Sequence, residues 1–305
     1  MKKFTTIFLA LVMAFSLTAC GGAKEEKNEV KTDKKEDVKD KKEEKPEKKE
    51  KEDPEFEEAI IVDNDEIKIS LTGVEPNDDY GYIIKTYIEN KTEDTDLTFT
   101  AQSASVNSLD VPVSFYNSVS GGKRANDEIT LDSQNWKEIK LGKVTEIALN
   151  LEVYDTEYED VYNETVYIYP EGQDNVKAFE RKSKDTDQVI LDNDYARITV
   201  IGTSYDDIWG YGLELYLENK TDSYVMFGVD NVYVNGYDID PYFANSVLPG
   251  ASKFETMSWD EEEFDANGID GVEGIEDVEF NVRVYDNEDW SLDNFVDEVV
   301  TYVNE

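Results

Sequence analysis

The sequence predicts an all-β protein made of two copies of one domain, and three observations support this. The chain repeats at an offset of 129 residues, because 13 of the 30 ungapped positions from Asp63 to Thr92 are identical to those from Asp192 to Thr221. Each copy has short runs in which apolar and polar residues alternate, as in strands with one buried face. Turn-forming residues separate these runs. Six to eight short strands in about 110 residues predict an immunoglobulin-like β-sandwich for each copy.

The strand assignments rest on matched positions in the two copies. Ile67, Ile69 and Leu71 alternate with polar residues, and Ile198 and Val200 do the same in the second copy. The strand that follows places apolar residues on one face in both copies, namely Tyr82, Ile84 and Ile88, and Tyr211, Leu213, Leu215 and Leu217. Two sheets packed through such faces form a sandwich.

Turn signals and composition set the domain limits. Asn235-Gly236 predicts a tight hairpin, and Asn107-Ser108 is its counterpart in the first copy. Residues 23–58 contain 12 lysines and 16 acidic residues, so they cannot bury an apolar face and are predicted to form a disordered or partly helical tether. The predicted organisation is a signal peptide at 1–19, a lipidated cysteine and tether at 20–58, β-sandwich domain 1 at 59–171, a linker at 172–187 and β-sandwich domain 2 at 188–305.

The N-terminus has the features of a secretory signal. Met1-Lys2-Lys3 is cationic, residues 4–15 are uncharged and mostly apolar, and Leu17-Thr18-Ala19-Cys20 follows. The apolar run is shorter than the roughly 20 residues that a membrane-spanning helix needs. Leu-Thr-Ala-Cys resembles the lipobox of bacterial lipoproteins, which implies that Cys20 carries palmitate and other acyl chains. Two or three such chains would hold the protein firmly on a membrane.

The charge of the chain excludes several classes of partner. The sequence contains 71 acidic and 30 basic residues, for a net charge of -41, and residues 59–305 account for 55 of the acidic and 16 of the basic residues. A surface this acidic repels phosphate backbones and anionic headgroups, so no nucleic-acid partner is expected. Membrane contact is expected only through the acyl chains on Cys20.

The residues for common catalytic mechanisms are missing. The chain has no histidine, and its one cysteine lies in the lipobox. Ser120-Gly121-Gly122-Lys123 has the Ser-x-x-Lys spacing of penicillin-interacting enzymes, but the companion motifs are absent and the second copy has Leu248 and Ala251 at these places. Two close carboxylates could serve a glycosidase, although each copy is small for such a cleft. The sequence therefore predicts a non-enzyme with no catalytic residues.

Calcium is the cofactor that the acidic residues best support. Asp63-Asn64-Asp65 and Asp192-Asn193-Asp194 precede the first long strand of each copy, and their oxygens are ligands of the type that Ca²⁺ prefers. The four candidate metal ligands are Asp63, Asp65, Asp192 and Asp194. A local turn stabilised by the Asp and Asn side chains is the alternative explanation.

Aromatic residues give the candidate ligand-binding surface. Tyr87 and Tyr216 lie on the polar faces of their strands, where an exposed ring could stack on a sugar or bind a cationic side chain. Loops at the ends of sandwiches often carry recognition, which favours the loop at 238–246 with Tyr242 and Phe243. The candidate ligand-binding residues are Tyr87, Tyr216, Tyr237, Tyr242 and Phe243.

The combination of a lipobox, a Lys- and Glu-rich tether, and tandem strands with Glu-Asn-Lys-Thr and Val-Asn-Gly resembles surface lipoproteins of Gram-positive bacteria with tandem immunoglobulin-like domains. That group has no settled activity. The resemblance implies a lipid anchor at the extracellular face of the cytoplasmic membrane. The leading hypothesis is a non-catalytic surface lipoprotein that presents two acidic binding modules to a protein or glycan. The alternative is a structural envelope protein that binds calcium.

Overall fold

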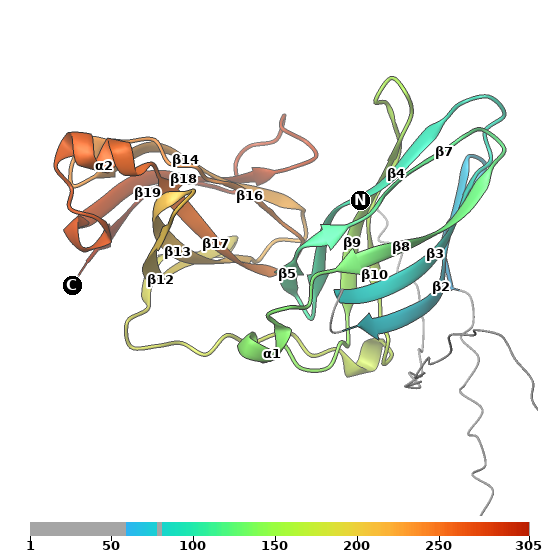
Figure 1. Ribbon diagram of the computed structural model, residues 1–305, viewed down its shortest axis with the longest axis horizontal. Helices are drawn as coiled ribbons and strands as arrows, with labels where there is room; N and C mark the ends of the chain where they lie inside the picture. Colours follow the sequence, from blue (N-terminus) through green and yellow to red (C-terminus); the bar gives the residue numbers. More distant parts are fainter. Residues whose placement is uncertain (1–58, 78–80, 305) are drawn as a thin grey trace, which may run out of the picture.

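The computed structural model describes residues 59–77 and 81–304, and in these residues the protein is almost entirely β structure (Figure 1). The chain forms two β-sandwich domains, one built from β1–β10 and the other from β11–β19. The predicted fold class is therefore confirmed. The predictions for the signal peptide, for Cys20 and for the tether lie outside the described residues. No helix in the described part of the chain is long and apolar enough to span a bilayer.

The first domain has the strand order of an immunoglobulin-like fold. Its elements are β1 (Ala59–Asp63), β2 (Ile67–Asn77), β3 (Gly81–Asn90), β4 (Leu97–Val106), β5 (Leu109–Val111), β6 (Val113–Ser114), β7 (Tyr116–Val119), β8 (Arg124–Leu131), α1 (Trp136–Ile139), β9 (Ile147–Tyr154) and β10 (Asp160–Ile168). One sheet has the order β1-β2-β3-β8-β6, and the other contains β10-β9-β4 with β5 and β7 also paired to β4. Strands A, B and E of the immunoglobulin fold correspond to β2, β3 and β8, and C, F and G to β4, β9 and β10.

The second domain repeats this arrangement. After the 3₁₀ turn η1 (Gln173–Asn175), it contains β11 (Gln188–Asp192), β12 (Ala196–Asp206), β13 (Gly210–Asn219), β14 (Val225–Val234), β15 (Tyr237–Asp238), β16 (Ala244–Val247), β17 (Ser252–Trp259), α2 (Glu261–Asn267), η2 (Val272–Gly274), β18 (Asp277–Asp286) and β19 (Val296–Val303). One sheet has the order β11-β12-β13-β17, and the other has β15-β14-β18-β19 with β16 paired to β14. The predicted hairpins occur in both domains, since Asn107, Ser108, Asn235 and Gly236 all have positive φ.

Each domain buries its own core between its two sheets. Ile67, Ile69 and Leu71 are at most 1% exposed, so the alternation in the sequence correctly predicted the inward face of β2. In the second domain the largest fully buried side chains include Trp259, Phe227 and Phe280. Because residues 59–304 contain no cysteine, this packing replaces the disulfide found in antibody domains.

A buried asparagine holds one end of each sandwich together. The side-chain amide of Asn90 donates to the carbonyls of Thr95 and Val119, and its oxygen accepts from Thr92. Asn219 does the same with Ser223, Val247, Leu248 and Thr221. The repeated Glu-Asn-Lys-Thr motif therefore joins the loop after β3 to the end of β7 in domain 1, and the loop after β13 to the end of β16 in domain 2.

The two domains meet where the Asn107-Ser108 hairpin of domain 1, between β4 and β5, reaches the start of β17. The amide of Ser252 donates to the carbonyl of Ser108, and the Lys253 ammonium lies 3.5 Å from the Asp110 carboxylate. One parallel bridge, Leu109 to Ser252, makes the sheets continuous at this point. Figure 1 shows this meeting at the middle of the molecule, where β5 lies beside β17. The link leaves the outer end of domain 2 free.

Candidate functional site

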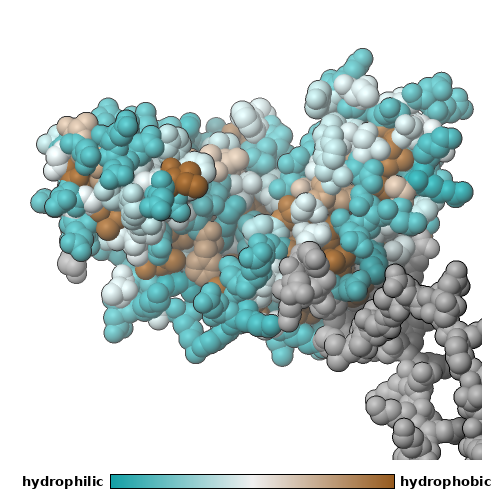
Figure 2. Space-filling model, in the orientation of Figure 1, coloured by the Kyte–Doolittle hydropathy of each residue, from teal (hydrophilic) through white to brown (hydrophobic). Residues whose placement is uncertain are grey.

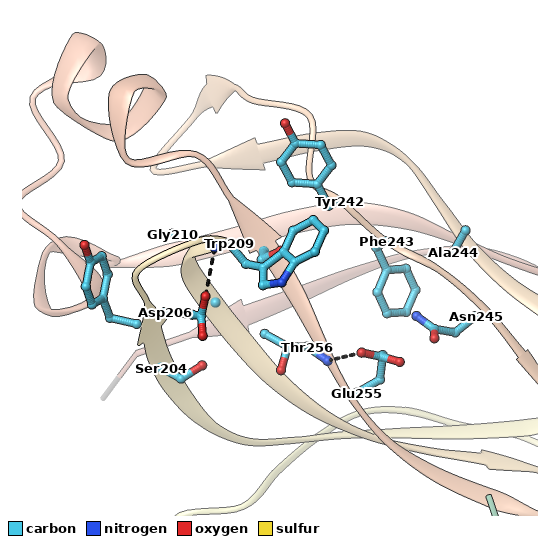
Figure 3. Close-up of a pocket in the computed structure, with 13 residues that line it drawn as sticks. Ser204, Asp206, Trp209, Gly210, Tyr242, Phe243, Ala244, Asn245, Glu255 and Thr256 are labelled. Atoms are coloured by element: carbon cyan, nitrogen blue, oxygen red, sulfur yellow. Dashed lines mark hydrogen bonds between the residues drawn. The ribbon is translucent and has the colours of Figure 1, made fainter. Parts of the chain in front are cut away.

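A groove of about 600 Å³ lies along one side of domain 2 (Figure 3). It is formed by the end of β12, the loop before β13, the segment that leads into β16, and β17. The lining residues are Ser204, Tyr205, Asp206, Trp209, Gly210, Gly212, Tyr242, Phe243, Ala244, Asn245, Glu255, Thr256 and Ser258. Four of these thirteen are aromatic, which makes the groove a candidate binding site.

The floor of the groove exists because residue 212 is a glycine. In the sheet, Gly212 lies opposite Ser204 on one side and Ser258 on the other. A Cβ atom at Gly212 would lie 2.5 Å from Cγ2 of Thr256 and 3.0 Å from Oγ of Ser204. A larger residue would therefore fill the space between these side chains. The floor presents small hydroxyl-bearing side chains on the outer face of β12, β13 and β17.

The loop before β13 holds Trp209 against this floor. The Asp206 carboxylate accepts hydrogen bonds from the backbone N–H groups of Ile208 and Trp209, at 2.8 and 3.0 Å. These two bonds lower the pKa of Asp206. Gly210 then turns the chain into β13 with a φ of +71°, and a side chain there would collide with the Trp259 carbonyl. The turn leaves Trp209 57% exposed at the mouth of the groove.

Tyr242 lies beside Trp209 and forms another wall of the groove. Its backbone pairs with Ser258 in an isolated antiparallel bridge, so the segment follows the edge of β17 before it crosses to the other sheet. The Tyr242 ring contacts Trp209 edge to face, with 6.0 Å between ring centroids. Its hydroxyl donates to Asp260, and this bond raises the pKa of Tyr242. Trp209 and Tyr242 therefore form a fixed aromatic corner, although each is more than half exposed.

The electrostatic character of the groove is negative. Its charged lining residues are Asp206 and Glu255, and no lysine or arginine is among the thirteen. Residues 188–305 contain 28 acidic side chains and four basic ones. Each of the four basic side chains forms an ion pair, as shown by Arg197 with Glu218, Lys220 with Asp192, Lys253 with Asp110 and Arg283 with Asp230. Domain 2 therefore has little positive charge with which to attract an anionic ligand.

The predicted ligand-binding residues have different positions. Tyr242 and Phe243 line the groove. Tyr237 is 47% exposed on β15 and is not part of the lining. Tyr87 is half-buried on β3, where its hydroxyl donates to Glu89. The Lys68 ammonium lies 5.5 Å from the Tyr87 ring centroid, so that face of the ring is already occupied by a cation.

The expectation that Tyr216 presents an exposed ring is wrong. Tyr216 is 7% exposed, and its hydroxyl donates to Ser252. Its ring lies 5.0 Å from that of Phe254 and 5.6 Å from the guanidinium of Arg181. The alternation pattern placed Tyr216 correctly on the outer face of the sheet. The linker residue Arg181, which comes from outside the sheet, covers that face.

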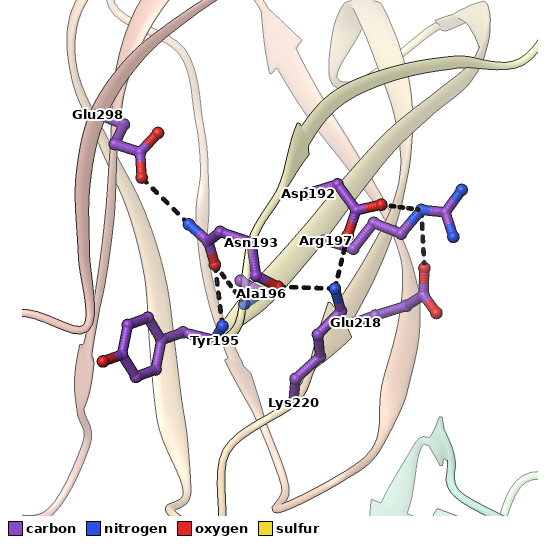
Figure 4. Close-up of polar contacts among 8 residues, drawn as sticks. All are labelled: Asp192, Asn193, Tyr195, Ala196, Arg197, Glu218, Lys220 and Glu298. Atoms are coloured by element: carbon purple, nitrogen blue, oxygen red, sulfur yellow. Dashed lines mark hydrogen bonds and ion pairs between the residues drawn. The ribbon is translucent and has the colours of Figure 1, made fainter.

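The candidate metal ligands Asp63 and Asp192 bind lysines. In domain 2, Lys220 donates to the Asp192 carboxylate and to the Asn193 carbonyl at 2.5 and 2.7 Å, while Asn193 accepts from the amides of Tyr195 and Ala196 (Figure 4). Domain 1 repeats these contacts with Lys91, Asp63 and Asn64. Lysine lowers the pKa of Asp63 and of Asp192.

Asp65 and Asp194 lie in the same turns as these lysine-bound aspartates. Across the described ranges, the structure brings together no group of three or more His, Cys, Asp or Glu side chains in a metal-binding arrangement. Calcium binding stays a prediction, and melting temperatures with and without millimolar calcium would test it.

The sequence predicted Tyr242 and Phe243 as binding residues, but it did not predict most of the other lining residues. The floor residues Ser204, Gly212 and Thr256 come from three strands, and only their pairing brings them together. One signal was available in the repeat, because Gly212 takes the place of Ile83 in the first copy. A loss of side-chain volume at an otherwise matched strand position indicates an opening on that face.

No protein-family model and no curated protein matches this sequence. Among solved structures, the chain is similar to the YadV chaperone, with 12% identity and a TM-score of 0.25 over 78% of this chain and 100% of that one. It is similar to the Salmonella enterica SafA pilin in complex with the SafB chaperone, with 13% identity and a TM-score of 0.24 over 80% and 98%. Red sea bream transglutaminase gives 11% identity and a TM-score of 0.24 over 78% and 31%.

Proposed function

We propose that this protein is a non-catalytic, lipid-anchored surface protein that binds a ligand in the groove of domain 2. The observation that carries the proposal is the pair of rings at the groove mouth, Trp209 and Tyr242, which are 57% and 52% exposed. Exposing two large rings beside a groove costs hydrophobic free energy, and proteins commonly accept that cost at binding sites. The anchor is proposed from the lipobox at Cys20 and places the groove outside the cell.

The arrangement of side chains supports binding rather than turnover. The lining offers aromatic faces, hydroxyl groups and an amide, which are groups that orient a ligand. The two carboxylates have other partners, because Asp206 caps the loop and Glu255 accepts from the amide of Thr256. These features suit reversible recognition of a ligand that lies across the surface.

The anchor is tested by feeding cells radiolabelled palmitate. We expect label in the full chain, no label in the Cys20→Ser variant, and release of that variant from the membrane fraction. Unlabelled wild-type protein would refute the anchor. The outcome has no bearing on the groove, which needs its own test.

Ligand binding is tested by capture from cell-wall material and secreted proteins. The full chain is compared with Trp209→Ala and with Trp290→Ala, in which the altered tryptophan is 78% exposed but is not a lining residue. We expect a bound component that Trp209→Ala loses and Trp290→Ala retains. Equal capture by all three proteins would contradict the proposed site.

A further inference from the structure

We infer that the groove binds an extended, cationic peptide segment, whose main chain lies along the open edge of β17 and whose lysine or arginine side chain packs against Trp209. This inference rests on the proposed function and names the ligand class for the same site. Three independent observations lead to it: an unpaired stretch of strand edge, the charge of domain 2, and the geometry of the aromatic corner.

The first observation concerns the backbone of β17. One edge of this strand pairs with β13 along its whole length. The other edge has a backbone partner at each end, Ser108 opposite Ser252 and Tyr242 opposite Ser258. Between them, the amide of Thr256 bonds to the carboxylate of Glu255. A side chain thus occupies a position that a neighbouring strand would fill, and the described residues supply no such strand.

An extended peptide fits this edge. From Ser252 to Ser258 a strand spans about 20 Å at roughly 3.3 Å per residue, which leaves room for a few residues between the two existing bridges. A peptide that adds to a sheet edge gains main-chain hydrogen bonds, while its alternate side chains enter neighbouring pockets. The groove includes Glu255 and Thr256, so side chains of such a peptide would enter it directly.

The second observation is the charge. With 28 acidic and four ion-paired basic side chains, residues 188–305 attract cations and repel anions. The carboxylates of Asp206 and Glu255 lie in the groove itself. A neutral glycan would gain nothing from this charge and could not use the strand edge, whereas a lysine or arginine peptide uses both.

The third observation is the aromatic corner. A cation over the face of tryptophan is attracted by the negative charge of the ring face, and the attraction grows as the cation is desolvated. Tyr242 contacts Trp209 edge to face, which fixes the angle between the rings. The backbone N–H of Trp209 donates to the Asp206 carboxylate at 3.0 Å, so the indole and this carboxylate belong to the same turn (Figure 3). A cationic side chain that approaches the groove would therefore meet the indole and a carboxylate together.

The test uses the full chain in nonionic detergent and calorimetric titration with four probes. The first is acetyl-Lys-Thr-Lys-Thr-Lys-Thr-amide, and the second replaces its lysines with glutamates. The third is the lysine peptide with N-methylated threonines, which cannot donate main-chain hydrogen bonds from those residues. The fourth is the neutral oligosaccharide tetra-N-acetylchitotetraose. Protein variants are Trp209→Ala and, as the matched control, Trp290→Ala.

We expect the lysine peptide to bind, the glutamate peptide not to bind, and N-methylation to weaken binding at least tenfold. Trp209→Ala should weaken binding of the lysine peptide at least about tenfold, and Trp290→Ala less than about twofold. Raising the salt concentration should weaken binding further, because screening reduces the attraction.

Three results would overturn the inference in different ways. If Trp209→Ala binds the lysine peptide as tightly as the wild type does, and N-methylation leaves the affinity unchanged, the attraction is nonspecific and the groove is not its site. If only the oligosaccharide binds, and does so through Trp209, the cationic-peptide inference fails while the proposed binding function stands. If no probe binds and cell-wall capture does not depend on Trp209, the proposed function fails as well.

Discussion

The two domains share nine strands, and they differ where domain 2 has its groove. There the isolated bridge of Tyr242 with Ser258 takes the place of β6. Gly212 lies at the centre of the groove floor, and Ile83 holds the matching position on β3. Tyr242 forms one wall, and the matching residue in the first copy is Ser114. Domain 1 thus has a large side chain on the sheet and a small one beside it. Domain 2 has a glycine on the sheet and a large ring beside it. The scaffold is common to the two copies, and differences in side-chain size at these positions accompany the groove of domain 2.

The hairpins of the two domains provide a second contrast. Asp110 follows the hairpin of domain 1, and its side chain is 13% exposed beside Lys253 of domain 2. Its counterpart Asp238 follows the hairpin of domain 2 and is exposed. The same turn therefore serves as a docking element in one copy and as a free tip in the other. Whether the other domain packs against the hairpin therefore decides whether its aspartate loses contact with water.

The largest expected effect tests what the domains share. Asn90→Ala and Asn219→Ala each remove a buried amide and leave carbonyl groups without donors, so each should lower the free energy of unfolding by about 2 to 4 kcal/mol. Chemical denaturation of the full chain measures this change. The control is Asn294→Ala, at an exposed position. A loss below about 0.5 kcal/mol at either site would contradict the shared role of the motif.

A pH titration sharpens the contrast between the hairpins. Burial raises the pKa of Asp110 to about 6, against the opposing attraction of Lys253. Because the folded-state pKa exceeds the unfolded one, the protonated form is favoured in the folded state, and stability falls as pH rises from about 4 to above 6. Relative to Asp110→Asn, the wild type should lose up to about 3 kcal/mol across this window.

The measurement is the midpoint of unfolding against pH for both proteins, with Asp238→Asn as the control at the exposed hairpin. The control should track the wild type at every pH. A constant difference between wild type and Asp110→Asn from pH 4 to pH 7 would refute the buried-carboxylate explanation.

Making the floor of domain 2 resemble that of domain 1 should abolish the groove. Gly212→Ile places a branched side chain between Ser204 and Thr256, and we expect affinity for the lysine peptide to fall at least tenfold, or about 1.4 kcal/mol. Gly228→Ile is the control, because it adds the same side chain on β14 of the other sheet. Circular dichroism and melting establish that both variants fold. Undiminished binding by folded Gly212→Ile would place the ligand elsewhere.

The smallest expected effect concerns the linker over Tyr216. Arg181 forms two hydrogen bonds of 2.7 Å to Asp187 and lies over the Tyr216 ring. Arg181→Ala should expose that ring and cost about 1 kcal/mol, whereas Lys182→Ala, at an exposed site, should cost little. Protection of Tyr216 from chemical iodination reports the covering directly. Protection that persists in Arg181→Ala would show that neighbours other than Arg181, among them Phe254, shield the ring.

Some features were predictable because they are local. The alternation of apolar and polar residues predicted which faces of β2 and β12 point inward, and the asparagines of the turns, which have positive φ, predicted the hairpins. Both signals depend on residues adjacent in the chain. The repeated Asp-Asn and Asn-Lys-Thr motifs could be recognised in the sequence, but the contact between them could not. Lys220 reaches back across 28 residues to Asp192, so aspartates that suggested calcium ligands are bound to lysine instead.

The sequence by itself determined the all-β class, the duplication and the strand faces, because each follows from spacing along the chain. Tertiary structure alone decided which tyrosines are exposed and where the groove lies. Tyr216 is buried by a linker that arrives from outside its sheet, and the floor under Trp209 combines β12, β13 and β17. Such contacts depend on packing between distant segments, and an alternating pattern specifies a face without specifying what covers it.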